Sequence, residues 1–189
     1  MGSTGRASRR ISRRGPASAG ALAALAALAC TAVPRRPPAT DAGLARLAAA
    51  VRHDAYGRPV DLGPLLAGRA ALYFFRTDCA HCAEDLAAAP RLAARLGAPA
   101  VVLLSREGAA RLRAALGHEP PGGLIVVADS EGAVMGEGGA LPTRYVPRYV
   151  GVVGSRVRLD VTGGRGAGLG AALAALGTGA GPAPPAGAP

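Results

Sequence analysis

Two cysteines separated by two residues, Cys79 and Cys82, are the part of this 189-residue sequence with the clearest chemistry. They follow an apolar run and stand where a helical pattern begins. The first turn of such a helix offers free backbone N–H groups and the positive end of the helix dipole, which stabilise a thiolate at Cys79. That thiolate can attack a disulfide of another molecule, and Cys82, one turn further on, can resolve the mixed disulfide. The sequence therefore predicts a redox-active dithiol.

Two charged residues next to the cysteines are expected to shift the pKa of Cys79. His81 lies between them and supplies a cation that would lower the pKa of Cys79, making the pair more oxidising. Asp78 precedes Cys79 and acts in the opposite direction.

Other uses of the cysteine pair fit less well. A zinc site needs four ligands, and only His53 and His118 remain to join the cluster. A c-type haem site needs histidine directly after the second cysteine, where this sequence has Ala83. A passive structural disulfide stays open, although so short a loop restricts the unfolded chain little. We therefore predict no metal and no cofactor.

The N-terminal residues 1–30 have the pattern of an export signal. Five arginines lie in the first 14 residues, and the apolar run Ala17–Ala29 follows them. This run is shorter than the about 20 apolar residues of a transmembrane helix. Ser8-Arg9-Arg10 resembles the start of a twin-arginine signal, so Tat and Sec export both stay open.

The third cysteine, Cys30, ends this segment. The residues before it satisfy a small-x-small cleavage site and also resemble a lipobox, so cleavage and lipidation of Cys30 both stay open. In either case the exported domain keeps only Cys79 and Cys82. Residues 31–40, rich in proline and arginine, are interpreted as an extended spacer.

The formal net charge of +10 reflects this targeting segment rather than a nucleic-acid partner. All 22 basic residues are arginine, and seven of them fall in residues 1–40, which hold no acid. Residues 41–189 carry the other 15 arginines against 12 acids, an ordinary balance for a soluble domain. No basic run interleaved with aromatic residues is present there, so we predict no nucleic-acid binding.

The domain itself is predicted to span residues 41–176. Apolar patterning predicts helices over residues 41–53, 80–96, 107–116 and 168–176, and strands over residues 70–75, 100–104, 124–128, 148–153 and 156–161. The alternation of the first three strands with helices implies parallel pairing, whereas Gly154-Ser155 predicts an antiparallel hairpin. Residues 57–64 are interpreted as turns, and the Gly/Ala/Pro tail 177–189 as disordered.

With these elements in place, residues 58–176 resemble the thioredoxin-like superfamily, most closely the exported TlpA/ResA-like thiol-disulfide oxidoreductases with a redoxin domain. The matching stretches are Val60-Asp61-Leu62 through Gly68-Arg69, Leu72-Tyr73-Phe74-Phe75, Cys79 to Cys82 with Asp85-Leu86, Asp129-Ser130-Glu131-Gly132, and Val146-Pro147. The resemblance implies an α/β fold of three layers, α/β/α, whose mixed central sheet has a parallel core and a C-terminal antiparallel hairpin.

The resemblance also implies roles for individual residues. Cys79 would be the nucleophile and Cys82 the resolving thiol. Asp85 takes the place of an acid that influences proton transfer in the family. Pro147 fits the cis-proline that faces the dithiol and docks the substrate backbone, with Pro142 as the rival position.

The sequence departs from the family at two positions. The residue before the first cysteine is usually tryptophan but is Asp78 here, so substrate packing beside the dithiol must differ. Tyr73 occupies the position of a buried acid in thioredoxin proper, which puts that proton route in doubt. We interpret the strand aromatics Tyr73, Phe74, Phe75 and Tyr149 as core residues, with a peptide-binding groove as the alternative. We interpret Arg144 and Arg148, which flank Pro147, as solvated charges.

These observations predict an exported thiol-disulfide oxidoreductase, tethered to the membrane and monomeric, that acts on protein thiols and disulfides with a membrane redox partner. The direction of electron flow stays open: His81 favours an oxidant, and family likeness favours a reductant, for example of apo-cytochrome c. A peroxiredoxin-like peroxidase using Cys79 is one alternative. A non-catalytic accessory module of an envelope or conjugation assembly is the other.

Overall fold

A computed structural model describes residues 37–95, 100–119, 124–163, 168–170, 174 and 176 of the chain. The predicted export segment with Cys30, the spacer up to residue 36 and the tail 177–189 lie outside the described residues. Residues 171–173 and 175 of the predicted helix 168–176 do so too.

A five-stranded mixed sheet with the order β3-β2-β1-β4-β5 forms the centre of the fold. Its strands are β1 Arg69–Phe74, β2 Ala100–Ser105, β3 Ile125–Ala128, β4 Arg148–Val153 and β5 Arg156–Thr162. The first three strands pair in parallel, and β4 joins β1 and β5 antiparallel. All five predicted strands are thereby confirmed to within one or two residues.

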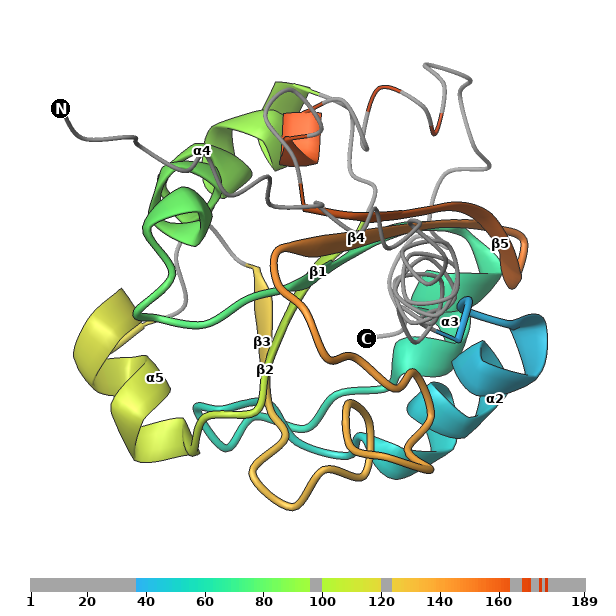
Figure 1. The fold of residues 1–189 in the computed structure, drawn as a ribbon, viewed down its shortest axis with the longest axis horizontal. Coiled ribbons are helices and arrows are strands. Elements are labelled where there is room, and N and C mark those ends of the chain that lie inside the picture. The colour runs from blue at the N-terminus through green and yellow to red at the C-terminus, as the bar shows by residue number, and fades with distance from the viewer. Residues whose placement is uncertain are drawn as a thin grey trace, which may run out of the picture. The chain divides into compact units, whose positions relative to one another are not determined.

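Helices cover both faces of this sheet (Figure 1). They are α2 Asp41–Ala50, α3 Leu62–Ala67, α4 Ala80–Arg95 and α5 Ala109–Leu116. Because successive strand residues point to opposite faces, Leu72 and Phe74 of β1 pack with α2 and α3, whereas Tyr73 and Phe75 pack with α4 and α5. The predicted three-layer α/β/α architecture is confirmed.

Helix α3 shows where the sequence interpretation was wrong. Residues 57–64 were expected to be turns throughout, but α3 already begins at Leu62. The carboxylate of Asp61 caps it by accepting the N–H of Gly63 at 2.9 Å. Pro64 sits in the first turn, where its missing N–H costs no hydrogen bond.

The β4–β5 hairpin turns at Gly154-Ser155, as predicted. Both residues have positive φ, 60° and 61°, the conformation of a type I′ turn. The expectation that Arg148 is a solvated charge is wrong, because its side chain is completely buried and paired with Asp160. Arg144 is exposed, as predicted.

Within the described residues, no helix is both long and apolar enough to span a bilayer.

Candidate active site: a disulfide at the start of helix α4

Cys79 and Cys82 are joined in a disulfide, with their Cα atoms 5.2 Å apart. Cys79 immediately precedes α4, and Cys82 lies in its first turn. The Sγ of Cys79 accepts the backbone N–H of Cys82 at 3.2 Å, which is the kind of donor expected to stabilise a thiolate there. Cys79 is half-buried and Cys82 is 0% exposed. Cys79 is therefore the more exposed cysteine of the pair.

The loop that leads from β1 to Cys79 is held by the carboxylate of Glu107. One carboxylate oxygen accepts the backbone N–H of Thr77 at 2.9 Å, and the other accepts its hydroxyl at 2.7 Å. Ser105 and Arg111 donate to the same carboxylate at 3.1 and 2.9 Å. Glu107, which lies 28 residues after Cys79 and two residues beyond the end of β2, thus fixes the segment that precedes Cys79.

Two charged residues next to the cysteines are exposed. Asp78 pairs with Arg76 at 2.5 Å, and the hydrogen bond from this guanidinium lowers the pKa of Asp78. The positive partner offsets part of the charge that Asp78 places beside Cys79. His81 also lies on the surface, on the first turn of α4.

Behind Cys82 lies a buried pair of tyrosines. The rings of Tyr73 and Tyr149 stack with centroids 5.1 Å apart, and the Tyr73 hydroxyl donates a long hydrogen bond of 3.5 Å to the carbonyl oxygen of Cys82. Burial raises the pKa of both hydroxyls, and the negative charge of Asp85 raises it further. Both phenols therefore stay protonated and act as donors at neutral pH. The predicted core position of the four strand aromatics is confirmed.

Asp85 lies one turn after Cys82 on α4 and joins three parts of the chain. Its carboxylate accepts the hydroxyl of Tyr149 from β4 and the backbone N–H of Leu169, the latter at 3.2 Å. The structure thus places the predicted acid on the Cys82 side of the dithiol, bonded to the tyrosine pair. The sequence carries no local signal for this pairing with Tyr149, which lies 64 residues away.

The peptide bond between Val146 and Pro147 is cis. This confirms Pro147 over Pro142 as the cis-proline, and its substrate-docking role stays a prediction. The carbonyl of Pro147 accepts the N–H of Gly163 at 2.7 Å, which fixes the start of β4 to the end of β5.

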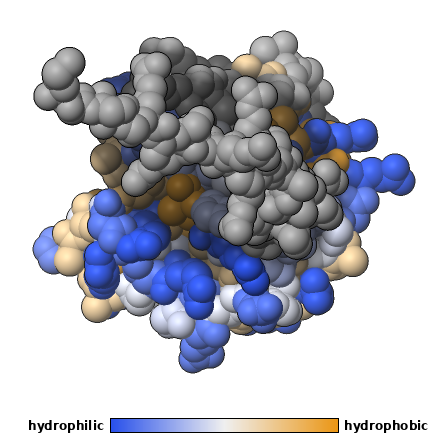
Figure 2. Space-filling view, in the orientation of Figure 1, coloured by the Kyte–Doolittle hydropathy of each residue, from blue (hydrophilic) through white to orange (hydrophobic). Residues whose placement is uncertain are grey.

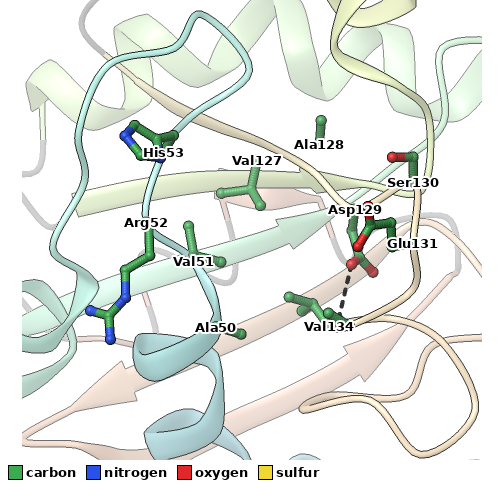
Figure 3. Close-up of a pocket in the computed structure, with 11 residues that line it drawn as sticks. Ala50, Val51, Arg52, His53, Val127, Ala128, Asp129, Ser130, Glu131 and Val134 are labelled. Atoms are coloured by element: carbon green, nitrogen blue, oxygen red, sulfur yellow. Dashed lines mark hydrogen bonds between the residues drawn. The ribbon is translucent and has the colours of Figure 1, made fainter.

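His53 and His118, the histidines weighed for a zinc site, do not gather with the cysteines among the described residues. Within the described part of the chain, no three histidine, cysteine or acidic side chains gather in a way that could hold a metal. His53 instead lines a pocket of about 310 Å³ between the end of α2 and the end of β3, and neither cysteine lines it (Figure 3). Asp129 in this pocket uses both carboxylate oxygens to accept backbone N–H groups of Val134 and Met135. Its role there is to fold the following loop.

Solved structures with a similar fold come from Mycobacterium tuberculosis. A secreted disulfide oxidoreductase described as homologous to E. coli DsbE superposes with a TM-score of 0.58, at 18% identity over 69% of this chain and 98% of that one. DsbF, in mixed oxidised and reduced forms, superposes with a TM-score of 0.56, at 20% identity over 66% of this chain and 92% of that one. No family model and no curated protein sequence matches the chain. These likenesses establish the thioredoxin-like fold that the sequence predicted.

Proposed function

We propose that this protein is a thiol-disulfide oxidoreductase that exchanges its Cys79–Cys82 disulfide with protein thiols. The observation that carries the proposal is the asymmetry of the pair: one sulfur is accessible at a helix N-terminus, and the other is buried behind it. A purely structural disulfide needs no such division, because neither sulfur has to meet a partner.

The exchange proceeds in two steps, written here for reduction of a substrate. The Cys79 thiolate attacks one sulfur of the substrate disulfide, that S–S bond breaks, and the departing substrate thiolate takes up a proton. The thiol of Cys82 then loses its proton, and its sulfur attacks Sγ of Cys79. This step releases the second substrate thiolate and closes the Cys79–Cys82 disulfide, so that two electrons have passed to the substrate. Oxidation of a substrate dithiol is the reverse, and a second thiol-disulfide protein resets the pair.

Asp85 and Pro147 take part in this proposal as supporting residues. Asp85 is the carboxylate one turn from Cys82, with contacts that hold it in place, and it assists the loss of the Cys82 proton. Pro147 directly precedes β4, the strand paired with β1, and it docks the substrate backbone.

The proposal includes an extracytoplasmic location and a membrane tether. It is supported by the arginine-rich and then apolar residues 1–30, and by the secreted nature of one of the fold neighbours. Envelope proteins with cysteine pairs, including apo-cytochrome c, are the proposed substrates, with a membrane protein as redox partner.

Serine variants of the two cysteines test the function. With insulin as the protein disulfide and dithiothreitol as the reductant, we expect Cys79→Ser to abolish the acceleration of insulin reduction. Reduced Cys82→Ser, mixed with insulin after the dithiothreitol has been removed, should instead accumulate a mixed disulfide visible on non-reducing gels, because Cys79 can attack but is not released. Cys30→Ser is the matched control and should behave as the wild type. Activity of Cys79→Ser equal to the wild type would refute the proposal, and peroxide-dependent turnover without insulin reduction would favour the peroxidase.

A further inference from the structure

The loop before β4 is closed by the side chain of Arg148, the first residue of that strand. Residues 142–148, termed here the docking arc, run from Pro142 to Arg148. The Nη1 of Arg148 donates to the carbonyl oxygen of Pro142 at 2.9 Å and to the hydroxyl of Thr143 at 2.8 Å. The two ends of the arc are therefore fastened to each other.

The same guanidinium is fastened to the hairpin. Its Nε and Nη2 donate to the two carboxylate oxygens of Asp160 at 3.0 and 2.9 Å, and its Cζ lies 5.2 Å from the centre of the Phe74 ring. Asp160 also accepts the backbone N–H of Ala39 at 2.7 Å. Arg148 is 0% exposed, and each of its three guanidinium nitrogens donates to an acceptor.

A fastening of this kind is not explained by stability alone. Replacing a buried ion pair by apolar residues of similar size is often neutral or stabilising. The presence of such a pair therefore does not by itself indicate that it stabilises the fold. Tyr145 lies in the arc that Arg148 closes, and its side chain is 54% exposed. Among the described residues, it is the one large hydrophobic residue that is exposed. Figure 2 shows one face of the molecule, on which hydrophilic residues are interspersed with neutral and hydrophobic ones.

The arc also lies at the dithiol end of the sheet. Arg148 pairs with Phe74, the last residue of β1, and the chain reaches Cys79 five residues later. Val146, in the middle of the arc, and Cys79 both pack against the core cluster that contains Tyr73 and Tyr149. The arc therefore leads into β4 beside the end of β1 from which the chain continues to Cys79.

We infer that Arg148 is a positioning residue for protein substrates, which holds the docking arc in one shape so that Tyr145 contacts an apolar side chain near the substrate cysteine. The inference rests on the proposed function and adds a specificity device to it. A rigid, pre-formed arc avoids the loss of conformational entropy that a loose loop would suffer on binding. Small disulfides do not reach Tyr145 and do not need the arc.

The test compares a protein disulfide with a small one. The variant Arg148→Met/Asp160→Leu removes both charges together and so leaves no unpaired buried charge. We expect its KM for insulin to rise about tenfold, equivalent to about 1.4 kcal/mol of docking free energy. Its reduced dithiol should react with 5,5′-dithiobis(2-nitrobenzoate) at the wild-type rate. Arg158→Met, on the exposed face of the same hairpin, is the matched control and should leave both values unchanged.

A second variant keeps the inference testable if the double variant does not fold. Tyr145→Ser changes an exposed side chain, and we expect it to raise the KM for insulin several-fold with kcat and the small-disulfide rate unchanged. An unchanged KM for insulin in Tyr145→Ser would overturn the inference, as would a parallel fall of both reactions in a folded double variant. Failure of the wild type with both disulfides would instead refute the proposed function itself.

Discussion

The two sides of the Cys79–Cys82 disulfide are built in opposite ways. On the outer side, formed by residues 76–79, the chain is polar and partly exposed, and the carboxylate of Glu107 holds it. On the inner side, formed by Cys82 and the tyrosine pair, the surroundings are aromatic and buried, and the carboxylate of Asp85 holds them.

This difference separates reactivity from stability. The outer side leaves the Cys79 sulfur accessible and gives it a backbone N–H donor. The inner side removes Cys82 from solvent and surrounds it with ring surface, which contributes to the core. Both carboxylates act by accepting hydrogen bonds from segments distant in sequence. Changes on the inner side should therefore affect folding most, and changes on the outer side should affect the reaction of Cys79 most.

The largest effect on stability is expected from Tyr73→Ala. The side chain is fully buried between Phe75 and Tyr149, so its removal leaves a cavity. We expect the free energy of unfolding to fall by about 3–5 kcal/mol, as for other large aromatic truncations in cores. Urea unfolding of the oxidised protein measures it. A loss similar to that of an exposed control, Tyr145→Ala, would contradict the assignment of the inner side to the core.

Glu107→Ala should have an intermediate effect. It leaves the N–H of Thr77 and two hydroxyl groups without their acceptor, so we expect a loss of about 2 kcal/mol in unfolding free energy. The alkylation rate of reduced Cys79 by iodoacetamide should change as well, because its loop is no longer fixed. Glu107→Gln keeps one acceptor oxygen and should show a smaller change in both measurements. Glu137→Ala, at an exposed glutamate, serves as the control. Equal losses in the Ala and Gln variants would show that the charge, rather than the hydrogen bonds, matters.

Tyr149→Phe should cost less, about 1 kcal/mol at neutral pH, because only the hydrogen bond to Asp85 is lost. Its pH dependence is more informative. The folded state raises the pKa of both inner tyrosines above the unfolded value near 10, so their contribution is fully present below about pH 10 and declines above it. Wild-type stability should therefore fall between about pH 10 and 12, and the fall should be shallower in Tyr149→Phe. Identical slopes would argue against two protonated buried phenols.

The smallest effect is expected from Asp78→Asn on the outer side. Asp78 is exposed and paired with Arg76, so its field at Cys79 is screened. We expect the pH of half-maximal iodoacetamide reaction of Cys79 to shift slightly downward, with the thermal midpoint unchanged. An upward shift would mean that Asp78 assists the thiolate rather than opposing it.

The sequence predicted the elements of this fold better than their contacts. Continuous apolar runs indicated β1, β2 and β3, and Gly154-Ser155 indicated the hairpin, because these signals are local. Helix α3 was missed because it has six residues, one of which is proline. Glu107 was missed because it meets Thr77 only through the parallel pairing of β1 and β2.

Arg148 was misjudged for a different reason, because its pairing depends on a β-bulge. A regular hairpin that turns at Gly154-Ser155 would place Arg148 opposite Val161. The register shift at Gly151/Val152 instead pairs Arg148 with Thr162, which makes Asp160 its diagonal neighbour on the same face. Its burial could not be predicted, since it depends on how the docking arc and Ala39 cover it.

The reduction potential of the Cys79–Cys82 pair is the most direct test of its proposed redox role. It can be measured by equilibrating the protein with glutathione buffers and trapping free thiols. An accessible Cys79 at a helix N-terminus predicts a value between those of thioredoxin and DsbA, about −270 to −120 mV. Values near the lower limit would indicate a reductant, and values near the upper limit an oxidant. A potential below about −300 mV, typical of structural disulfides, would contradict the redox function.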